Sequence, residues 1–272
     1  MTIPLDGFET TRFAHQQVER CVYRRGEGPG VVIMHEVPGI TPQVAHFARR
    51  VADAGFHVAL PHLFGTPGRP LSAGYLAGQM LRACVNREFA VLAAHRASPV
   101  TEWLRALGRA LHAERGGVGV GAVGMCLTGN FALALMLDPG LLAPVLSQPS
   151  LPFPFGARRR AALHVSASQL ETIRRRAREE GVRVLGLRFT ADPLCPAARF
   201  ETLRRELGEG FEAIEIDSRP GNPHRIPRTA HSVLSADLVD EQGHPTHEAL
   251  ERVLGFLRER LRPASEGRSE RV

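Results

Sequence analysis

A cysteine occupies the centre of the segment GMCLTG, residues 124–129, near the middle of this 272-residue chain. Small residues around a central nucleophile are typical of the sharp strand-to-helix turn called a nucleophile elbow, which exposes the reactive side chain above a sheet. The N–H groups that follow the turn begin a helix, so they can stabilise a thiolate and a developing oxyanion. A buried cysteine is the more ordinary use of this residue type. The position of Cys126 in a glycine-containing turn nevertheless favours its interpretation as a nucleophile.

An acid and a base follow the cysteine in the chain. Asp192 comes just after the strand-like segment 184–189, and His231 comes after the strand-like segment 211–217. The order nucleophile, acid, base is the order found in α/β-hydrolases. An aspartate before a proline is also common in turns. We interpret His231 as the base for Cys126 and Asp192 as the group that orients it.

Three other histidines are alternatives to His231. His244 and His247 stand at the start of the last predicted helix, which favours a role in its cap, and His224 lies in a loop rich in proline and glycine. A metal site built from them would lack an acidic or cysteine partner at a suitable spacing. We therefore expect neither a metal nor any other cofactor.

Three glycines also satisfy the dinucleotide pattern G-x-G-x-x-G, namely Gly119, Gly121 and Gly124. The first two fall inside the strand predicted over 118–123 rather than in the turn that opens the helix. No acidic residue lies about 20 positions further on, where a ribose would require one. The pattern therefore gives little support to an NAD-dependent oxidoreductase, which ranks third among the candidate functions, after a hydrolase and a non-hydrolytic protein.

Strand-like and helix-like segments alternate along the chain. Strands are predicted at 17–24, 31–34, 56–60, 118–123, 143–147, 182–189 and 211–217, and helices at 41–54, 73–95, 100–114, 127–137, 167–180, 197–207 and 245–262. This alternation predicts an α/β fold with a mostly parallel central sheet covered by helices on both faces. Ligands of such sheets bind at the carboxyl ends of the strands. We expect one domain over residues 1–263 and a disordered tail over the small, polar residues 264–272.

The formal net charge of +6 comes from arginine alone, because all 34 basic residues are arginine, which is typical of a GC-rich bacterial genome. The arginines mix with glutamates on amphipathic helices, and the runs 158–160 and 174–176 are interpreted as solvated faces rather than a nucleic-acid site. The chain has no run of about 18 apolar residues, so the sequence predicts no membrane span. The start of the chain lacks a signal-peptide pattern. The four cysteines show no Cys-x-x-Cys spacing, which argues against a zinc ribbon or a thioredoxin-type dithiol. Four thiols in a chain without an export signal fit a reducing cytosol, so we expect a cytoplasmic protein. Its oligomeric state stays open.

Taken together, these motifs resemble the dienelactone hydrolase (carboxymethylenebutenolidase) family of α/β-hydrolases, whose elbow has the pattern G-x-C-x-G-G. Gly124, Cys126 and Gly129 match this pattern, and Thr128 replaces the first glycine of the final pair. The segment VVIMHEVPGI, residues 31–40, is similar to the family's strand that ends in a glutamate before a glycine-containing loop. The resemblance covers about residues 15–262.

The resemblance implies ester or lactone hydrolysis through a thiol ester. By the same match Glu36 is the family's active-site glutamate, and the N–H groups of Val37 and Leu127 form the oxyanion hole. A carboxylate beside a thiol can accept its proton or hold it by a hydrogen bond, and we state this as a hypothesis for Glu36. Small-molecule esters or lactones are the expected substrates.

Two departures from the family leave the substrate open. No arginine occurs in the segment SVLS, residues 232–235, although members that take carboxylated lactones use arginines to hold the carboxylate. Arg82 and Arg87 are substrate-binding candidates, although the sequence favours a helix-surface position for each. The arginine-rich segment 149–180 suggests a modified rim or lid.

The alternative from another class is a non-hydrolytic protein with the same fold, in which Cys126 is a redox-responsive or relic thiol, since a fold alone never determines function. The complete set of cysteine, histidine, aspartate and glutamate favours the enzyme.

Overall fold

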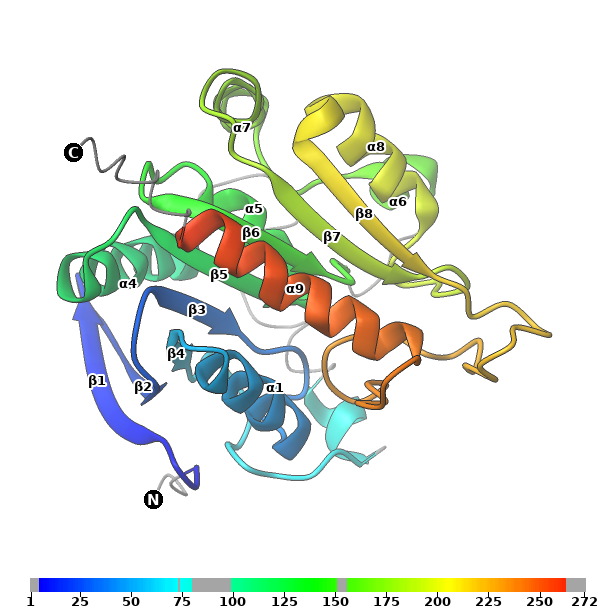
Figure 1. Ribbon diagram of the computed structural model, residues 1–272, viewed down its shortest axis with the longest axis horizontal. Helices are drawn as coiled ribbons and strands as arrows, with labels where there is room; N and C mark the ends of the chain where they lie inside the picture. The colour runs from blue at the N-terminus through cyan, green and yellow to red at the C-terminus, as the bar shows by residue number, and fades with distance from the viewer. Residues whose placement is uncertain (1–4, 73, 80–98, 151–155, 263–272) are drawn as a thin grey trace, which may run out of the picture.

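The structure, a computed structural model, describes residues 5–72, 74–79, 99–150 and 156–262. Eight strands of this part form one sheet in the order β1-β2-β4-β3-β5-β6-β7-β8 (Figure 1). The strands are β1 (Glu9–His15), β2 (Val18–Arg25), β3 (Gly30–Met34), β4 (His57–Pro61), β5 (Val120–Met125), β6 (Leu141–Ser147), β7 (Val184–Phe189) and β8 (Phe211–Ile216). The β1–β2 and β2–β4 pairs are antiparallel, and all other pairs are parallel.

The central strands are apolar because both of their faces are covered. All five residues of β3 are buried, and its side chains alternate between the two sides of the sheet. Val31 and Ile33 pack into one hydrophobic core, whereas Val32 and Met34 pack into the other. The parallel sheet with helices on both faces, predicted from the sequence, is thus confirmed.

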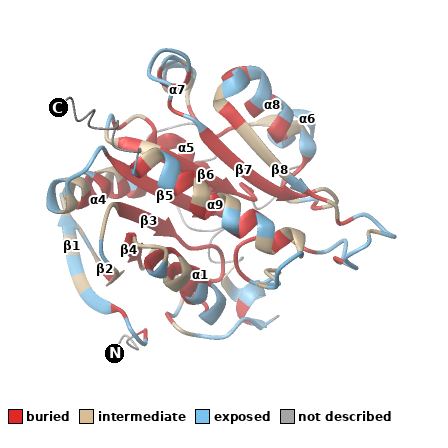
Figure 2. Cartoon of the chain, in the orientation of Figure 1, coloured by how far each residue is buried: buried red, intermediate tan, exposed pale blue. Residues whose placement is uncertain are grey.

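Helices α1 (Pro42–Asp53) and α9 (Pro245–Leu261) bury their apolar sides in one core. Helices α4 (Pro99–Arg115), α5 (Gly129–Leu135), α7 (Ala167–Glu179) and α8 (Ala197–Leu207) contribute to the other core. A short helix, α6 (Ala157–Ala161), packs near α8. Burial follows this layering, since the central strands are buried and the outer sides of the helices are exposed (Figure 2).

The start of α1 places a loop beside the end of β3. Thr41 caps the helix, with its hydroxyl oxygen accepting the Val44 N–H at 3.3 Å, and Pro42 occupies the first turn. Residues 35–40 must therefore connect β3 to α1 at the carboxyl end of the strand, where Glu36 and Val37 lie.

Some predicted elements are corrected by the structure. Strand β1 was not predicted, because its exposed edge position lets polar residues alternate with half-buried ones. The strand predicted from 118 begins at Val120, so Gly119 precedes it, whereas Gly121 lies inside it. The helix predicted from 127 starts with a 3₁₀ turn, Cys126–Thr128, and continues as α5.

Two further predictions reach beyond the described residues. Residues 74–79 of the helix predicted over 73–95 are helical, and residues 80–95 lie outside the described part, as does the tail 264–272. Within the described part, none of the helices has the length and apolar character needed to cross a membrane.

The two arginine runs differ in their surroundings. Residues 158–160 are exposed, as expected. Arg174 forms ion pairs with Glu171 and Glu206. The prediction of a solvated face is wrong for Arg176, which is 2% exposed and donates to the backbone oxygens of residues 136, 138, 139 and 141. A guanidinium has five donors, which suits it to join the end of α5 to α7 in this way.

Candidate active site

The turn after β5 has the geometry of a nucleophile elbow. Cys126 adopts a φ of +55°, in the left-handed region that non-glycine residues rarely enter. A Cβ atom added at Gly124 would lie 2.2 Å from the Thr128 carbonyl oxygen, and one added at Gly129 would lie 2.9 Å from Cα of Pro149. The small residues around the cysteine are therefore required by the close approach of strand, turn and helix.

Thr128, which departs from the family pattern, joins the elbow to the end of β3. Its buried hydroxyl oxygen accepts the Met125 N–H at 3.0 Å and lies 2.8 Å from the carbonyl oxygen of Met34 and 2.9 Å from that of Met125. A glycine could not make these contacts. The replacement thus adds a side-chain link between the strand that ends in the cysteine turn and the strand that leads to Glu36.

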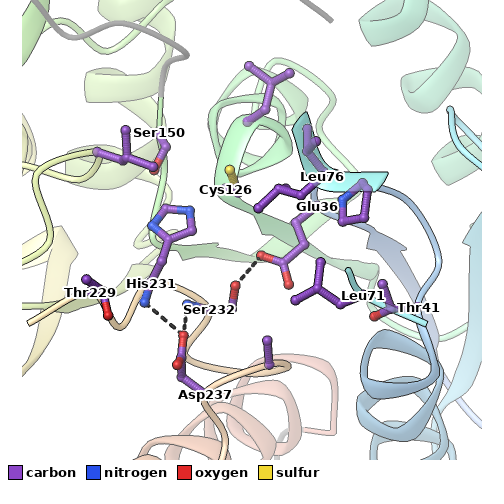
Figure 3. Close-up of a pocket in the computed structure, with 15 residues that line it drawn as sticks. Glu36, Thr41, Leu71, Leu76, Cys126, Ser150, Thr229, His231, Ser232 and Asp237 are labelled. Carbon is purple, nitrogen blue, oxygen red and sulfur yellow. Dashed lines mark hydrogen bonds between the residues drawn. The ribbon is translucent and has the colours of Figure 1, made fainter. Parts of the chain in front are cut away.

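Cys126 opens onto a cavity of about 340 Å³ at the carboxyl ends of the strands. Glu36, Val37, Leu127 and His231 line the same cavity, so the structure brings together four more of the predicted site residues (Figure 3). Val37 follows β3 and Leu127 follows the cysteine, which places both predicted oxyanion-hole residues beside the thiol.

Asp192 orients His231. Its Oδ2 lies 2.7 Å from Nδ1 of His231, and its Oδ1 accepts the Leu194 N–H at 2.8 Å. The Asp192 side chain is 1% exposed. An ionised carboxylate only accepts, so this bond puts a proton on Nδ1. The opposite ring nitrogen, Nε2, is buried, and the His231 side chain interacts with Cys126, so this nitrogen is available for proton transfer with that thiol.

The protonated form of His231 is favoured by its neighbours. Burial alone would lower the pKa of this imidazole, but the charge and hydrogen-bond interactions with Cys126 and Asp192 outweigh burial. The pKa of His231 therefore lies well above its ordinary value. A histidine in this environment can hold a proton next to a thiolate and deliver it later.

Glu36 lines the cavity, but its hydrogen bonds lead toward the His231 loop. The carboxylate accepts from the Ser232 hydroxyl at 2.8 Å, from the Ser235 hydroxyl, and from Nε2 of Gln148 at 3.2 Å. Burial raises the pKa of Glu36, although the charge of His231 and these hydrogen bonds oppose the rise. These partners hold both carboxylate oxygens, a different arrangement from the expected hydrogen bond between Glu36 and the thiol.

Two residues that the sequence did not single out complete the surroundings of His231. Oδ2 of Asp237 accepts the N–H groups of His231 at 2.8 Å and of Ser232 at 2.9 Å (Figure 3). Gln148, fully buried directly after β6, bridges Glu36 and the His231 loop, since its Oε1 also accepts the Val233 N–H. A polar residue at the carboxyl end of a buried strand was the available signal for Gln148. A turn-forming residue close to His231 was the signal for Asp237.

The remaining candidates lie elsewhere. His244 caps α9, as predicted, and His247 binds Asp240 at 2.8 Å. His224 stacks edge-on against His244. In the described ranges, no three histidine, cysteine or acidic side chains gather closely enough to hold a metal ion. Arg82 and Arg87 lie outside the described residues.

The comparisons with known proteins identify the family and the fold of this chain. The model of the dienelactone hydrolase family matches residues 21–261. A dienelactone hydrolase-like promiscuous phosphotriesterase from metagenomic libraries superposes with a TM-score of 0.62 at 18% identity, over 93% of this chain and 98% of that one. The dienelactone hydrolase of Anabaena variabilis gives 0.53 at 16% identity, over 94% and 98%. None of the curated proteins compared with the chain matches it.

A third solved structure has a similar fold. An α/β serine hydrolase without a lid, from Xanthomonas campestris, superposes with a TM-score of 0.51 at 12% identity, over 95% of each chain. At such low identities, these three structures show a shared fold alone.

Proposed function

Because the chain belongs to the dienelactone hydrolase family and is a hydrolase of the α/β-hydrolase fold, we propose that it cleaves a carboxylic ester or lactone with Cys126 as the nucleophile. The observation that carries this proposal is the arrangement of His231. Its ring binds Asp192 through Nδ1, it interacts with Cys126 on the other side, and both neighbours raise its pKa. The proposed reaction uses no cofactor and takes a small molecule as its substrate.

In the first half of the proposed reaction, the Cys126 thiolate attacks the carbonyl carbon and forms a C–S bond. The backbone N–H groups of Val37 and Leu127 stabilise the oxyanion. When the intermediate collapses, the C–O bond to the alcohol breaks, and Nε2 of His231 protonates the departing alkoxide. A lactone substrate would stay attached to the enzyme as one opened acyl chain.

In the second half, neutral His231 takes a proton from water, and the hydroxide attacks the thiol ester. The C–S bond breaks, the carboxylic acid leaves, and the thiolate and imidazolium are restored. Asp192 keeps the ring in the orientation that both proton transfers require.

Glu36 is proposed as a positioning residue in this reaction. Its hydrogen bonds to Ser232 and Ser235 bracket the chain directly after His231, and Gln148 holds the carboxylate from the side of β6. This role differs from the hypothesis that Glu36 accepts or holds the proton of the thiol, and it is supported by the three hydrogen bonds that the carboxylate accepts from Ser232, Ser235 and Gln148.

The test is hydrolysis of p-nitrophenyl acetate by wild type, Cys126→Ala and Cys21→Ala. The first variant should lose at least about a thousandfold in kcat/KM, because it removes the nucleophile. Cys21, a partly buried free cysteine in β2, is a matched control and should retain wild-type activity. Near-full activity of Cys126→Ala would overturn the proposal. Labelling of Cys126 by iodoacetamide without any ester turnover by the wild type would instead favour the non-hydrolytic alternative.

A further inference from the structure

Apolar side chains form one wall of the active-site cavity. Among the described residues, the large hydrophobic side chains that stay exposed are Leu71 at 43%, Leu76 at 37%, Val118 at 49% and Val239 at 39%. Both leucines line the cavity that contains Cys126, and they lie on the side of Glu36, across from His231 (Figure 3). Single exposed apolar residues are ordinary, but two on one wall of an active-site cavity form a surface that a ligand can cover.

This wall is fixed to the oxyanion-hole loop. Leu76 belongs to the helical residues 74–79, next to Tyr75, which is only 6% exposed. The Tyr75 hydroxyl accepts the Thr66 N–H at 2.6 Å and donates to the Pro38 carbonyl oxygen at 3.2 Å. Because Pro38 directly follows Val37, the apolar wall is held in place beside the N–H group proposed to bind the oxyanion.

The charges around the cavity are unfavourable for a second carboxylate. The charged side chains in the described lining are Glu36, Asp237 and His231. Two of them are acidic, and the histidine is already bound to Asp192. A substrate carboxylate would lose its hydration here beside Glu36 and Asp237, and the cation of the described lining, protonated His231, is already paired with Asp192, so its burial would be costly.

The buried Arg199 does not supply a cationic partner. Burial lowers the pKa of its guanidinium, and the side chain is 1% exposed and does not line the cavity. Its guanidinium donates to the backbone oxygens of Ala162, Pro149 and Arg159. Arg199 therefore anchors the segment after β6 to α8 instead of facing a substrate.

Resting on the proposed hydrolase function, we infer that the substrate is a small, uncharged ester or lactone whose apolar group sits against Leu71 and Leu76. The cavity of about 340 Å³ is at the lower end of the range of roughly 300–1,000 Å³ for ligand pockets. A carboxylated lactone, which some members of the family take, would find no unpaired cation in the described lining of the cavity.

A comparison on the wild-type enzyme tests the charge preference directly. p-Nitrophenyl hexanoate and p-nitrophenyl hydrogen adipate have acyl chains of equal length and differ in a terminal methyl or carboxylate. We expect kcat/KM for the hexanoate to exceed that for the adipate by roughly a hundredfold, since the carboxylate would be buried unpaired. Equal or faster hydrolysis of the adipate would overturn the inference.

Substitutions test the apolar wall. Leu71→Gln and Leu76→Gln should each lower the kcat/KM ratio of hexanoate to acetate by roughly fivefold, because each removes apolar contact with the longer chain. Val118→Gln is the matched control, since Val118 is equally exposed but precedes β5 at the opposite end of the sheet, and it should leave the ratio unchanged. An unchanged ratio in both leucine variants would contradict the proposal that the acyl chain binds against Leu71 and Leu76.

Failure of this inference is separable from failure of the proposed function. If Cys126→Ala abolishes hydrolysis of every ester while the hexanoate shows no preference over the adipate, the nucleophile stands and the substrate class is wrong. If Cys126→Ala still hydrolyses the acetate, the proposed function itself is wrong.

Discussion

Two buried carboxylates flank the His231 loop, and they contact different parts of it. Asp192, from the end of β7, binds the imidazole ring itself at 2.7 Å. Glu36, from the end of β3, binds the hydroxyls of Ser232 and Ser235 and makes its remaining hydrogen bond to Gln148. One carboxylate therefore acts on a group proposed to transfer protons, and the other binds side chains of the loop that carries this group.

The difference teaches that burial and position at a strand end do not by themselves decide the role of an acid. The charge and hydrogen bond of Asp192 raise the pKa of His231 against its burial. For Glu36, by contrast, the main effect is on its own pKa, which burial raises. We expect loss of Asp192 to change the chemistry of the site, and loss of Glu36 to change its geometry.

The largest effect is expected for Asp192→Asn. The amide cannot stabilise the imidazolium as a carboxylate does, so kcat/KM should fall about 10³- to 10⁴-fold. Because Asp192 raises the pKa of His231, its removal lowers that pKa, and His231 loses its proton at lower pH. The alkaline limb of the pH profile, measured with an alkyl ester, should therefore move to lower pH. An unshifted limb would contradict the role assigned to Asp192.

Glu36→Gln should have a smaller effect of a different kind. We expect kcat/KM to fall about 10- to 100-fold as the His231 loop loses one of its two acceptor oxygens. Because the charges of Glu36 and His231 interact, the alkaline limb should also move to lower pH, but by less than in Asp192→Asn. Alkylation of Cys126 by iodoacetamide should proceed within about threefold of the wild-type rate, since alkylation needs the thiolate alone. A large fall in the alkylation rate would show that Glu36 does act on the thiol.

Substituting Ser232 and Ser235 one at a time separates the contributions of their two hydrogen bonds to Glu36. Ser232→Ala and Ser235→Ala each remove one donor from a buried carboxylate, so each should lower the free energy of unfolding by about 1–3 kcal/mol. Chemical denaturation measures this loss. In a double-mutant cycle with Glu36→Gln, each serine effect should shrink, because the partners share one network. Fully additive effects would mean that the hydroxyls do not act through Glu36.

Asp237 should show the smallest effect. Its Oδ2 accepts two backbone N–H groups, and the amide oxygen of Asp237→Asn can accept both of them. We expect kcat/KM within about threefold of wild type for Asp237→Asn and a fall of about tenfold for Asp237→Ala. A fall as large as that for Asp192→Asn would assign Asp237 a part in the proton transfers.

The parts of the fold that could be predicted are those recorded in local pattern. Short apolar runs mark the central strands, and Thr41-Pro42 marks the start of α1. Strand β1 escaped prediction because at an exposed edge no face is fully buried. The solvated interpretation of Arg176 failed because its partners are backbone oxygens around the end of α5, which no pattern in α7 reveals.

The sequence by itself determined the elbow around Cys126 and the order in which Asp192 and His231 follow it, because small residues in a turn and polar residues after strands are local features. Only the tertiary structure decided the partners of Glu36, which lie 112, 196 and 199 residues away at Gln148, Ser232 and Ser235. It likewise decided that Leu71 and Leu76 face the cavity. Contacts of this kind depend on how loops from separate strands pack against one another at the edge of the sheet, and hydrophobic periodicity along the chain carries no record of that packing.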